Sequence, residues 1–290
     1  MLKCFIILIL VIAILFFAEC RRELTYFVVR KYQLSLTKFN KIHGSKKIVI
    51  LADLHSKVYG KHNDILIDAV KKENPDIILI AGDMLVGKID EDTTEAVHIV
   101  LELVKIARVY YVLGNHEQRL KENVEEYGTT LYTEYYSQLN DAGVVFLENS
   151  KADLEFDELK VSIYGLELPM YTYNKFERHH MHRQDVEGYL GRPDKERFNI
   201  LLAHNPLFVP AYKEWGADLM VSGHLHGGLI RIPGIGAVIT PQARLFPKYS
   251  GEMRVEDEQA VIVSRGLGTH TVNVRFFNQA ELVSLELLPS

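Results

Sequence analysis

Short apolar runs alternate with longer amphipathic stretches along the first half of the chain. The apolar runs lie at residues 48–52, 76–83 and 109–116, and they contain the β-branched and aromatic residues that are typical of strands. The stretches that follow them, at residues 63–73, 93–107 and 131–142, favour helices. Strands that alternate with helices of this length predict βαβ units and a largely parallel sheet, so the expected fold class is α/β.

The second half of the chain is richer in strand patterns. Residues 154–165 predict a hairpin that turns near Asp157 and Glu158, and residues 166–195 predict an irregular insertion with a short helix. Strand patterns resume at Phe198 and recur up to the C-terminal residues. An edge strand is also expected at residues 28–39, before the first βαβ unit.

An unbroken apolar segment occupies residues 4–18, with Lys3 before it and Glu19 after it. A spanning helix needs about 20 residues, and flanking side chains can make up the difference, so we expect an uncleaved membrane anchor. A cleaved signal peptide and a buried core helix are the alternatives, although Ala18 followed by Glu19 makes a poor cleavage site. The expected organisation is an anchor at residues 1–22, a linker with the edge strand at 23–46, and one large domain at 47–290 with its insertion at about 166–195.

The charges beside this segment predict its orientation. Lys3 is the one basic side chain before it, whereas four basic side chains follow it within residues 19–31, namely Arg21, Arg22, Arg30 and Lys31. The positive-inside rule therefore places the large domain on the cytoplasmic side of a single-pass anchor.

Composition narrows the chemistry of the large domain. The formal net charge is -5, so nucleic acid is not expected as a partner. The two cysteines, Cys4 and Cys20, lie in or beside the apolar segment, which excludes a disulfide framework and a zinc–thiolate site from the rest of the chain. Any metal in the large domain must therefore be held by oxygen and nitrogen atoms.

Five apolar runs end in side chains that can bind a metal. These side chains are Asp53 and His55, Asp83, Asn115 and His116, His204, and finally His224 and His226. Taken singly, a carboxylate could serve as a turn or cap residue, and a histidine could be a hydrogen-bonded core residue. Ligand sites form at the carboxyl ends of strands in open α/β sheets, so five such ends in one chain predict a common site.

The candidate metal ligands comprise two carboxylates, one amide and four imidazoles. They are Asp53, His55, Asp83, Asn115, His204, His224 and His226. One ion takes about four to six donors, so this set predicts two divalent ions that share a carboxylate. Nitrogen and oxygen donors without thiolate favour Mn, Fe or Zn over Ca or Mg. Two carboxylates leave a residual positive charge that favours a phosphate ester and a bridging hydroxide, which predicts phosphoester hydrolysis.

The same residues fall in five motifs that occur in a fixed order. They are DLH at residues 53–55, GD at 82–83, GNHE at 114–117, a lone His at 204 and GHLH at 223–226. In this order they resemble the calcineurin-like metallophosphoesterase superfamily, over about residues 47–288. The resemblance implies a four-layer αββα sandwich, in which helices flank two mixed sheets. The N-terminal apolar segment and the C-terminal block at residues 264–287 are similar to the membrane-associated bacterial branch.

The resemblance also implies a role for each residue of the site. Asp53, His55 and His226 would hold one metal. Asn115, His204 and His224 would hold the other, with Asp83 as the bridge. His116 would contact the phosphate and protonate the leaving oxygen, and Glu117 would orient His116.

The expected function is hydrolysis of a phosphodiester or a pyrophosphate by attack of the bridging hydroxide. A membrane anchor extends the expected substrates to lipid-linked phosphoesters. One alternative is a cyclic-nucleotide or nucleic-acid phosphodiesterase. A protein phosphatase is disfavoured because the residues after Asp83, "MLVGK", lack an Asp-Arg-Gly continuation. The non-enzyme alternative is a membrane-tethered metal-binding scaffold, for which His116 would have no use.

Overall fold

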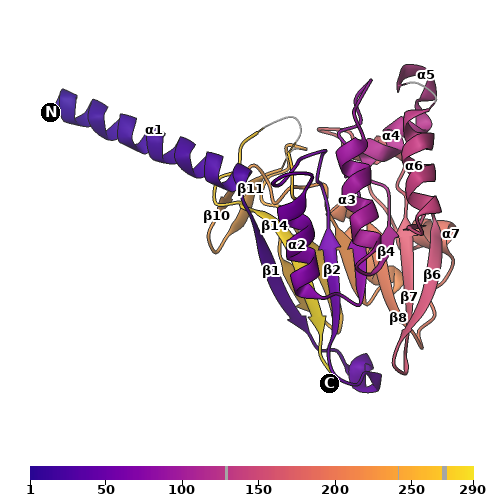
Figure 1. Cartoon of the computed structure of the whole chain (residues 1–290). Coiled ribbons are helices and arrows are strands. Elements are labelled where there is room, and N and C mark those ends of the chain that lie inside the picture. Colours follow the sequence, from indigo (N-terminus) through magenta and orange to yellow (C-terminus); the bar gives the residue numbers. More distant parts are fainter. Residues whose placement is uncertain (128–129, 241, 270–272) are drawn as a thin grey trace.

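Two six-stranded sheets pack face to face in the computed structural model, and helices cover their outer faces (Figure 1). The structure describes residues 1–127, 130–240, 242–269 and 273–290, so residues 270–272 of the C-terminal block lie outside the described residues. The N-terminal helix α1 (Leu2–Thr25) projects away from the sheets (Figure 1).

The first sheet has the strand order β1-β14-β2-β3-β4-β5. Its strands are β1 (Phe27–Leu34), β2 (Lys46–Leu51), β3 (Ile77–Ile80), β4 (Arg108–Tyr111), β5 (Val145–Phe146) and β14 (Ala280–Leu287). Neighbouring strands are parallel except for β14 and β2, so the sheet is mixed. The β1 strand lies at its edge and pairs with β14, with Phe27 opposite Ala280.

The second sheet has the strand order β12-β13-β9-β8-β7-β6 and is also mixed. Its strands are β6 (Ser150–Phe156), β7 (Leu159–Leu166), β8 (Phe198–Ala203), β9 (Leu219–Ser222), β12 (Met253–Glu256) and β13 (Gln259–Val263). A separate two-stranded hairpin is formed by β10 (Ile230–Ile232) and β11 (Gly236–Ile239).

Helices lie on both outer faces. The first sheet is covered by α2 (Asp64–Glu73), α3 (Thr94–Val104) and α6 (Leu131–Asp141), and the second by α7 (Arg183–Leu190) and α8 (Val209–Trp215). Two helices, α4 (Asn115–Glu122) and α5 (Val124–Tyr127), follow β4. Short 3-10 turns occur at η1 (Thr37–Lys41), η2 (Met170–Tyr173) and η3 (Pro206–Phe208).

The layers explain why the strands are continuous apolar runs. In β2, Ile48 and Ile50 point into the core between the two sheets, whereas Val49 and Leu51 point into the core under α2 and α3. A third core, which includes Trp215, lies between the second sheet and α7 and α8. A strand that is covered on both faces has no polar side to alternate with.

The predicted fold class is confirmed, because two mixed sheets are flanked by helices. The predicted hairpin is also present as β6 and β7, which turn at Asp157 and Glu158. The sequence did not predict α4, whose residues are almost all polar, or α8, which is only seven residues long. Helix α1 is long and apolar enough to cross a membrane, and most of its apolar residues are exposed. The domain boundaries stay predictions.

Candidate metal centre

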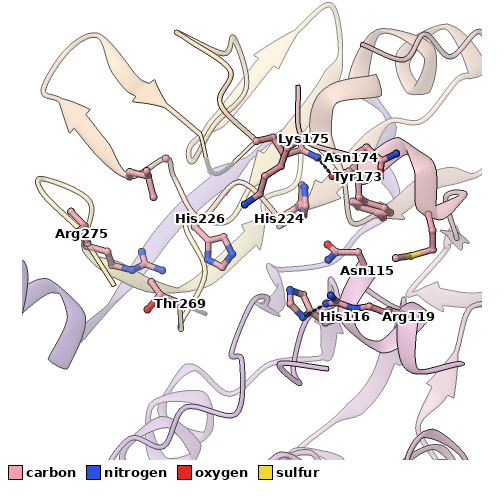
Figure 2. A pocket seen from close by; sticks show the side chains of 15 residues that line it. Asn115, His116, Arg119, Tyr173, Asn174, Lys175, His224, His226, Thr269 and Arg275 are labelled. Carbon is pink, nitrogen blue, oxygen red and sulfur yellow. Dashed lines mark hydrogen bonds between the residues drawn. The ribbon is translucent and has the colours of Figure 1, made fainter. Parts of the chain in front are cut away.

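The carboxyl ends of strands from both sheets meet at one place. Asp53 follows β2, Asp83 follows β3, and Asn115 begins α4 directly after the turn that ends β4. From the second sheet, His204 follows β8, and the loop after β9 carries His224 and His226. The side chains of Asn115, His224 and His226 line one cavity together with His116 (Figure 2).

The backbone at this place is strained. Five of the predicted ligands have a positive φ, namely Asp53 (51°), His55 (50°), Asp83 (55°), His224 (67°) and His226 (51°). Residues other than glycine rarely adopt this conformation, and each such residue costs about 1–3 kcal/mol. Strain of this kind persists where the surrounding structure holds it, and it clusters at functional sites.

The ligand atoms form three overlapping groups. In each group the atoms lie within 4.8 Å of one another: Asp53, His55 and His226; His55, Asp83 and His116; and Asp83, His204 and His224. Asp83 belongs to two of the groups. Its Oδ2 lies 3.0 Å from Nε2 of His204 and 3.8 Å from Nε2 of His55. This carboxylate therefore faces imidazoles on two sides.

The tautomers of the histidines favour a cation between them. Nδ1 of His55 lies 3.1 Å from the Leu85 carbonyl oxygen, and Nδ1 of His226 lies 3.1 Å from the Gly268 carbonyl oxygen. Such contacts place the proton of a neutral ring on Nδ1 and the lone pair on Nε2. The two Nε2 atoms are only 3.3 Å apart, so their lone pairs would repel each other without a positive charge nearby.

Asn115 provides a second observation that fits a metal. Its Oδ1 is buried, and no described residue donates a hydrogen bond to it. A buried amide oxygen without a donor is costly, whereas a hard cation would satisfy it. The residues that the sequence predicts as ligands therefore suit a metal by chemistry as well as by position.

Burial and mutual charge shift the pKa values of the two carboxylates of the centre in opposite directions. Burial raises the pKa of Asp53 to about 7, although His204 opposes the shift. Burial would also raise the pKa of Asp83, but the imidazoles of His204 and His116 outweigh it and hold that pKa well below its usual range. Burial would lower the pKa of His204, yet the Asp83 carboxylate raises it to about 9.

His116 is held at the first turn of α4. Its backbone N–H donates to Oδ1 of Asp83 at 2.9 Å, and its Nδ1 contacts both the Val86 carbonyl oxygen and the Arg119 guanidinium. Its Nε2 is 3.8 Å from Oδ2 of Asp83. The ring therefore faces the same carboxylate as the predicted ligands, and Arg119 beside it also lines the cavity (Figure 2).

The resemblance implies that Glu117 orients His116, but the contacts of its carboxylate are with other residues. Its carboxylate is fully buried and accepts N–H groups from Asp83 at 2.9 Å and from Gly114 at 3.0 Å. It also accepts the N–H groups of Met84 and Leu85. Glu117 therefore connects the loop after β3 to the turn after β4, and we call this set of hydrogen bonds the clamp of Glu117.

The cavity has a volume of about 370 Å³ and includes residues that the sequence did not single out as functional. Tyr173 of η2 packs edge-on against His224 with ring centroids 4.9 Å apart. Arg275 is fully buried, and its guanidinium donates to the carbonyl oxygens of Gly266, Gly268 and Asn278. No sequence signal marks Arg275, since it stands in a loop between an apolar residue and two phenylalanines.

Known proteins are similar to this chain in sequence. A family model described as calcineurin-like phosphoesterase matches residues 46–228. The uncharacterized metallophosphoesterase YkuE of Bacillus subtilis (strain 168) is 27% identical over 248 residues, which cover 83% of this chain and 78% of that protein. The phosphodiesterase YaeI of Escherichia coli (strain K12) is 24% identical over 248 residues, which cover 83% of this chain and 82% of that protein.

One solved structure has the same fold. The crystal structure of the phosphopantetheinyl hydrolase PptH from Mycobacterium tuberculosis superposes with a TM-score of 0.50 at 14% sequence identity. The superposition covers 79% of this chain and 91% of that chain. At this identity the likeness concerns the architecture of the sheets and helices.

Proposed function

The chain belongs to the calcineurin-like phosphoesterase family and is a metal-dependent phosphohydrolase, and we propose from this that it cleaves a phosphodiester or a pyrophosphate with two metal ions. The observation that carries the proposal is the position of Asp83, whose carboxylate belongs to two groups of ligand atoms. A carboxylate in that position can serve two ions at once. The name of the relative YaeI, a phosphodiesterase, supports a diester.

Two ions would divide the ligands between them. Asp53, His55 and His226 would hold one ion. Asn115, His204 and His224 would hold the other, and both would share Asp83. The mixture of nitrogen and oxygen donors favours Mn, Fe or Zn. The bound pair would supply Lewis-acid polarisation of the phosphoryl oxygens and activation of a water molecule.

Side chains of the protein protonate the leaving oxygen and hold the residues of the centre in place. We assign protonation of the leaving oxygen to His116, because contacts at its Nδ1 leave Nε2 on the side of Asp83. Tyr173 keeps the ring of His224 in place by packing on it. The guanidinium of Arg275, fixed by three carbonyl oxygens, adds a positive charge to the wall that receives the anionic substrate.

We also propose that α1 anchors the enzyme as a single-pass helix with the large domain on the cytoplasmic side. The exposed Arg21 and Arg22 follow the apolar part of α1, which supports this orientation. Only Tyr26 separates α1 from β1, so the cavity lies close to any membrane that α1 crosses. This closeness favours a lipid-linked phosphoester as the substrate.

The test compares four variants on bis-p-nitrophenyl phosphate with added Mn²⁺. Asp83→Ala should lose both activity and bound metal, whereas His116→Ala should lose activity and keep its metal. Asp68→Ala and His62→Ala are matched controls, because both side chains are exposed on or beside α2, and they should change neither quantity.

Metal content is measured by plasma mass spectrometry on the same samples. Unchanged turnover in Asp83→Ala or in His116→Ala would contradict the assignment. A wild-type protein that binds the metal but hydrolyses no diester or pyrophosphate would instead support a metal-binding scaffold.

A further inference from the structure

The C-terminal end of α1 is packed into the domain. Cys20 and Glu23 are buried, and the Glu23 carboxylate accepts the backbone N–H of Asn278 at 2.7 Å. On the same side of the helix, Phe16 packs against Phe276 with ring centroids 4.7 Å apart. A helix held in this way cannot swing freely, so the orientation of α1 fixes the orientation of the domain.

The β10–β11 hairpin beside this end of α1 has its polar and apolar faces reversed (Figure 1). Along β10, Ile230 and Ile232 are exposed, whereas Arg231 between them is 6% exposed and donates to the carbonyl oxygens of Gly227 and Ser250. At the turn of the hairpin, Ile235 is 63% exposed. In a hairpin that faces water, alternation normally turns the charged residue outward and the isoleucines inward.

The hairpin and the loop that contacts α1 form one apolar surface. Ile230 pairs with Phe276 in an isolated bridge, and the ring of Phe276 packs at a tilt against that of Phe277 with ring centroids 4.4 Å apart. Phe277 is 49% exposed and has a φ of 53°, so the chain holds an exposed aromatic ring in a strained conformation. We call this surface the apolar collar, and it consists of Ile230, Ile232, Ile235, Phe276 and Phe277.

We propose that the apolar collar rests in the surface of the lipid bilayer that α1 crosses. The apolar part of α1, from Leu2 to Ala18, gives a length of about 26 Å at 1.5 Å per residue, against a hydrocarbon core of about 30 Å. Local thinning of the bilayer makes up the difference, so the helix can span the core while Cys20 and Glu23 stay packed in the domain. Because Phe16 belongs to the apolar stretch and touches Phe276, the collar reaches the level at which that stretch enters the membrane. Exposed Arg21 and Arg22 lie about 8–9 Å further along the helix axis, on the side of the domain, where lipid phosphates can pair with them.

This contact sets the height of the cavity above the membrane. Arg275, which directly precedes the collar, lines the cavity, and so do Gly228 and Leu229, which lead into β10. With the collar in the bilayer surface, the opening of the cavity lies at the level of the headgroups. On the basis of the proposed function, the substrate class is then a phosphoester in the headgroup layer of a membrane lipid, whose acyl chains stay in the bilayer.

The experiment uses the full chain reconstituted in vesicles of phosphatidylcholine and phosphatidylglycerol. Tryptophan is introduced at the hairpin turn (Ile235→Trp) or at a matched exposed position (Val255→Trp), and brominated phosphatidylcholine serves as the quencher. Val255 is 48% exposed and pairs with Ala260, near the end of β13 that is farthest from the metal centre. The native Trp215 is buried and gives the same background in both variants.

We expect the added fluorescence of Ile235→Trp to be quenched and that of Val255→Trp to persist. Equal quenching of the two variants, or failure of the protein to float with the vesicles, would overturn the proposal. Quenching at residue 235 that disappears on dilution of the protein in lipid would assign the collar to a second copy of the chain and would also overturn it.

A second variant separates this proposal from the proposed function. Ile232→Ser combined with Ile235→Ser makes the collar more polar without touching the cavity. Its hydrolysis of bis-p-nitrophenyl phosphate should equal that of the wild type, which shows that the domain is folded. If the wild type does not hydrolyse bis-p-nitrophenyl phosphate, that result contradicts the proposed function alone. The proposal on the collar is tested separately, because the quenching experiment does not depend on turnover.

Discussion

Glu117→Gln removes a carboxylate that ties two strand ends together. Its Oε2 accepts the N–H groups of Asp83 and Gly114, and its Oε1 accepts those of Met84 and Leu85. Glutamine keeps only one oxygen. In its better orientation the amide retains the contacts of Oε1 and turns its NH₂ group toward the N–H groups of Asp83 and Gly114.

The expected loss of stability follows from this count. Two buried N–H groups lose their acceptor, and each unsatisfied donor costs about 1–3 kcal/mol, so the gross loss is about 2–6 kcal/mol. Burial raises the pKa of Glu117, which means that the charged carboxylate is itself costly there. Removing the charge returns part of the loss, and the free energy of unfolding should fall by about 2–4 kcal/mol. A domain of ordinary stability, about 5–15 kcal/mol, would feel this strongly.

The measurement is urea unfolding of the full chain in detergent micelles, followed by far-ultraviolet circular dichroism. Glu122→Gln is the matched control, since Glu122 is exposed on the same helix and should change stability by less than about 0.5 kcal/mol. Metal content should also fall in Glu117→Gln, because the clamp holds the segments that carry Asp83 and Asn115. Equal stability of the two variants would show that the four amides do not depend on this carboxylate, and would refute the reasoning.

Gly114→Ala places a Cβ 2.1 Å from Oδ1 of Asp83, so it should displace this carboxylate and lower metal content, whereas Gly188→Ala in α7 meets no atom within 4 Å and should keep both metal and activity. Burial lowers the pKa of Lys57 to about 8 from its ordinary 10.5. Between these values the unfolded chain binds more protons, so the stability of the wild type should rise with pH relative to Lys57→Met in urea titrations; parallel curves would argue against a lowered pKa of the partly buried Lys57. Mn²⁺ at a hundredfold excess over its Kd should stabilise the wild type by about 2.7 kcal/mol for each ion bound and leave the unfolding midpoint of Asp83→Ala unchanged.

The layers of sheets and helices and the position of the candidate metal centre could be predicted, because both depend on local patterns in the sequence. The run at β2 is apolar on both faces since two cores cover it, and this leaves a short uninterrupted signal in the sequence. Polar residues such as Asp53 and Asp83 directly after such runs stand at the carboxyl edge of a sheet by geometry alone. The sequence therefore predicts that they meet, without predicting how the second sheet is oriented.

The partners of these residues depend on contacts between distant segments. The clamp of Glu117 reaches from α4 to the loop after β3, about 33 residues earlier in the chain. Arg275 is buried only because carbonyl oxygens of its own loop and of Gly266 surround it. Neither environment leaves a periodic signal, since a charged residue in a polar helix or a loop reads as exposed. The sequence pattern thus marks candidate ligands more clearly than it marks the groups that position them.

The β10 strand shows a further reason why alternation alone is insufficient. A period of two separates Ile230 and Ile232 from Arg231, but it does not say which set faces the protein. Here the guanidinium of Arg231 satisfies carbonyl oxygens that the chain would otherwise bury unpaired, and this draws the charged side inward. The isoleucines must then face outward, beside the end of a helix whose apolar side chains are also exposed. The hairpin and α1 are separate elements, yet both expose apolar side chains next to each other, and such a surface is unfavourable in water. One apolar medium that covers both would remove this cost, which is why we connect the hairpin and α1 to the same bilayer.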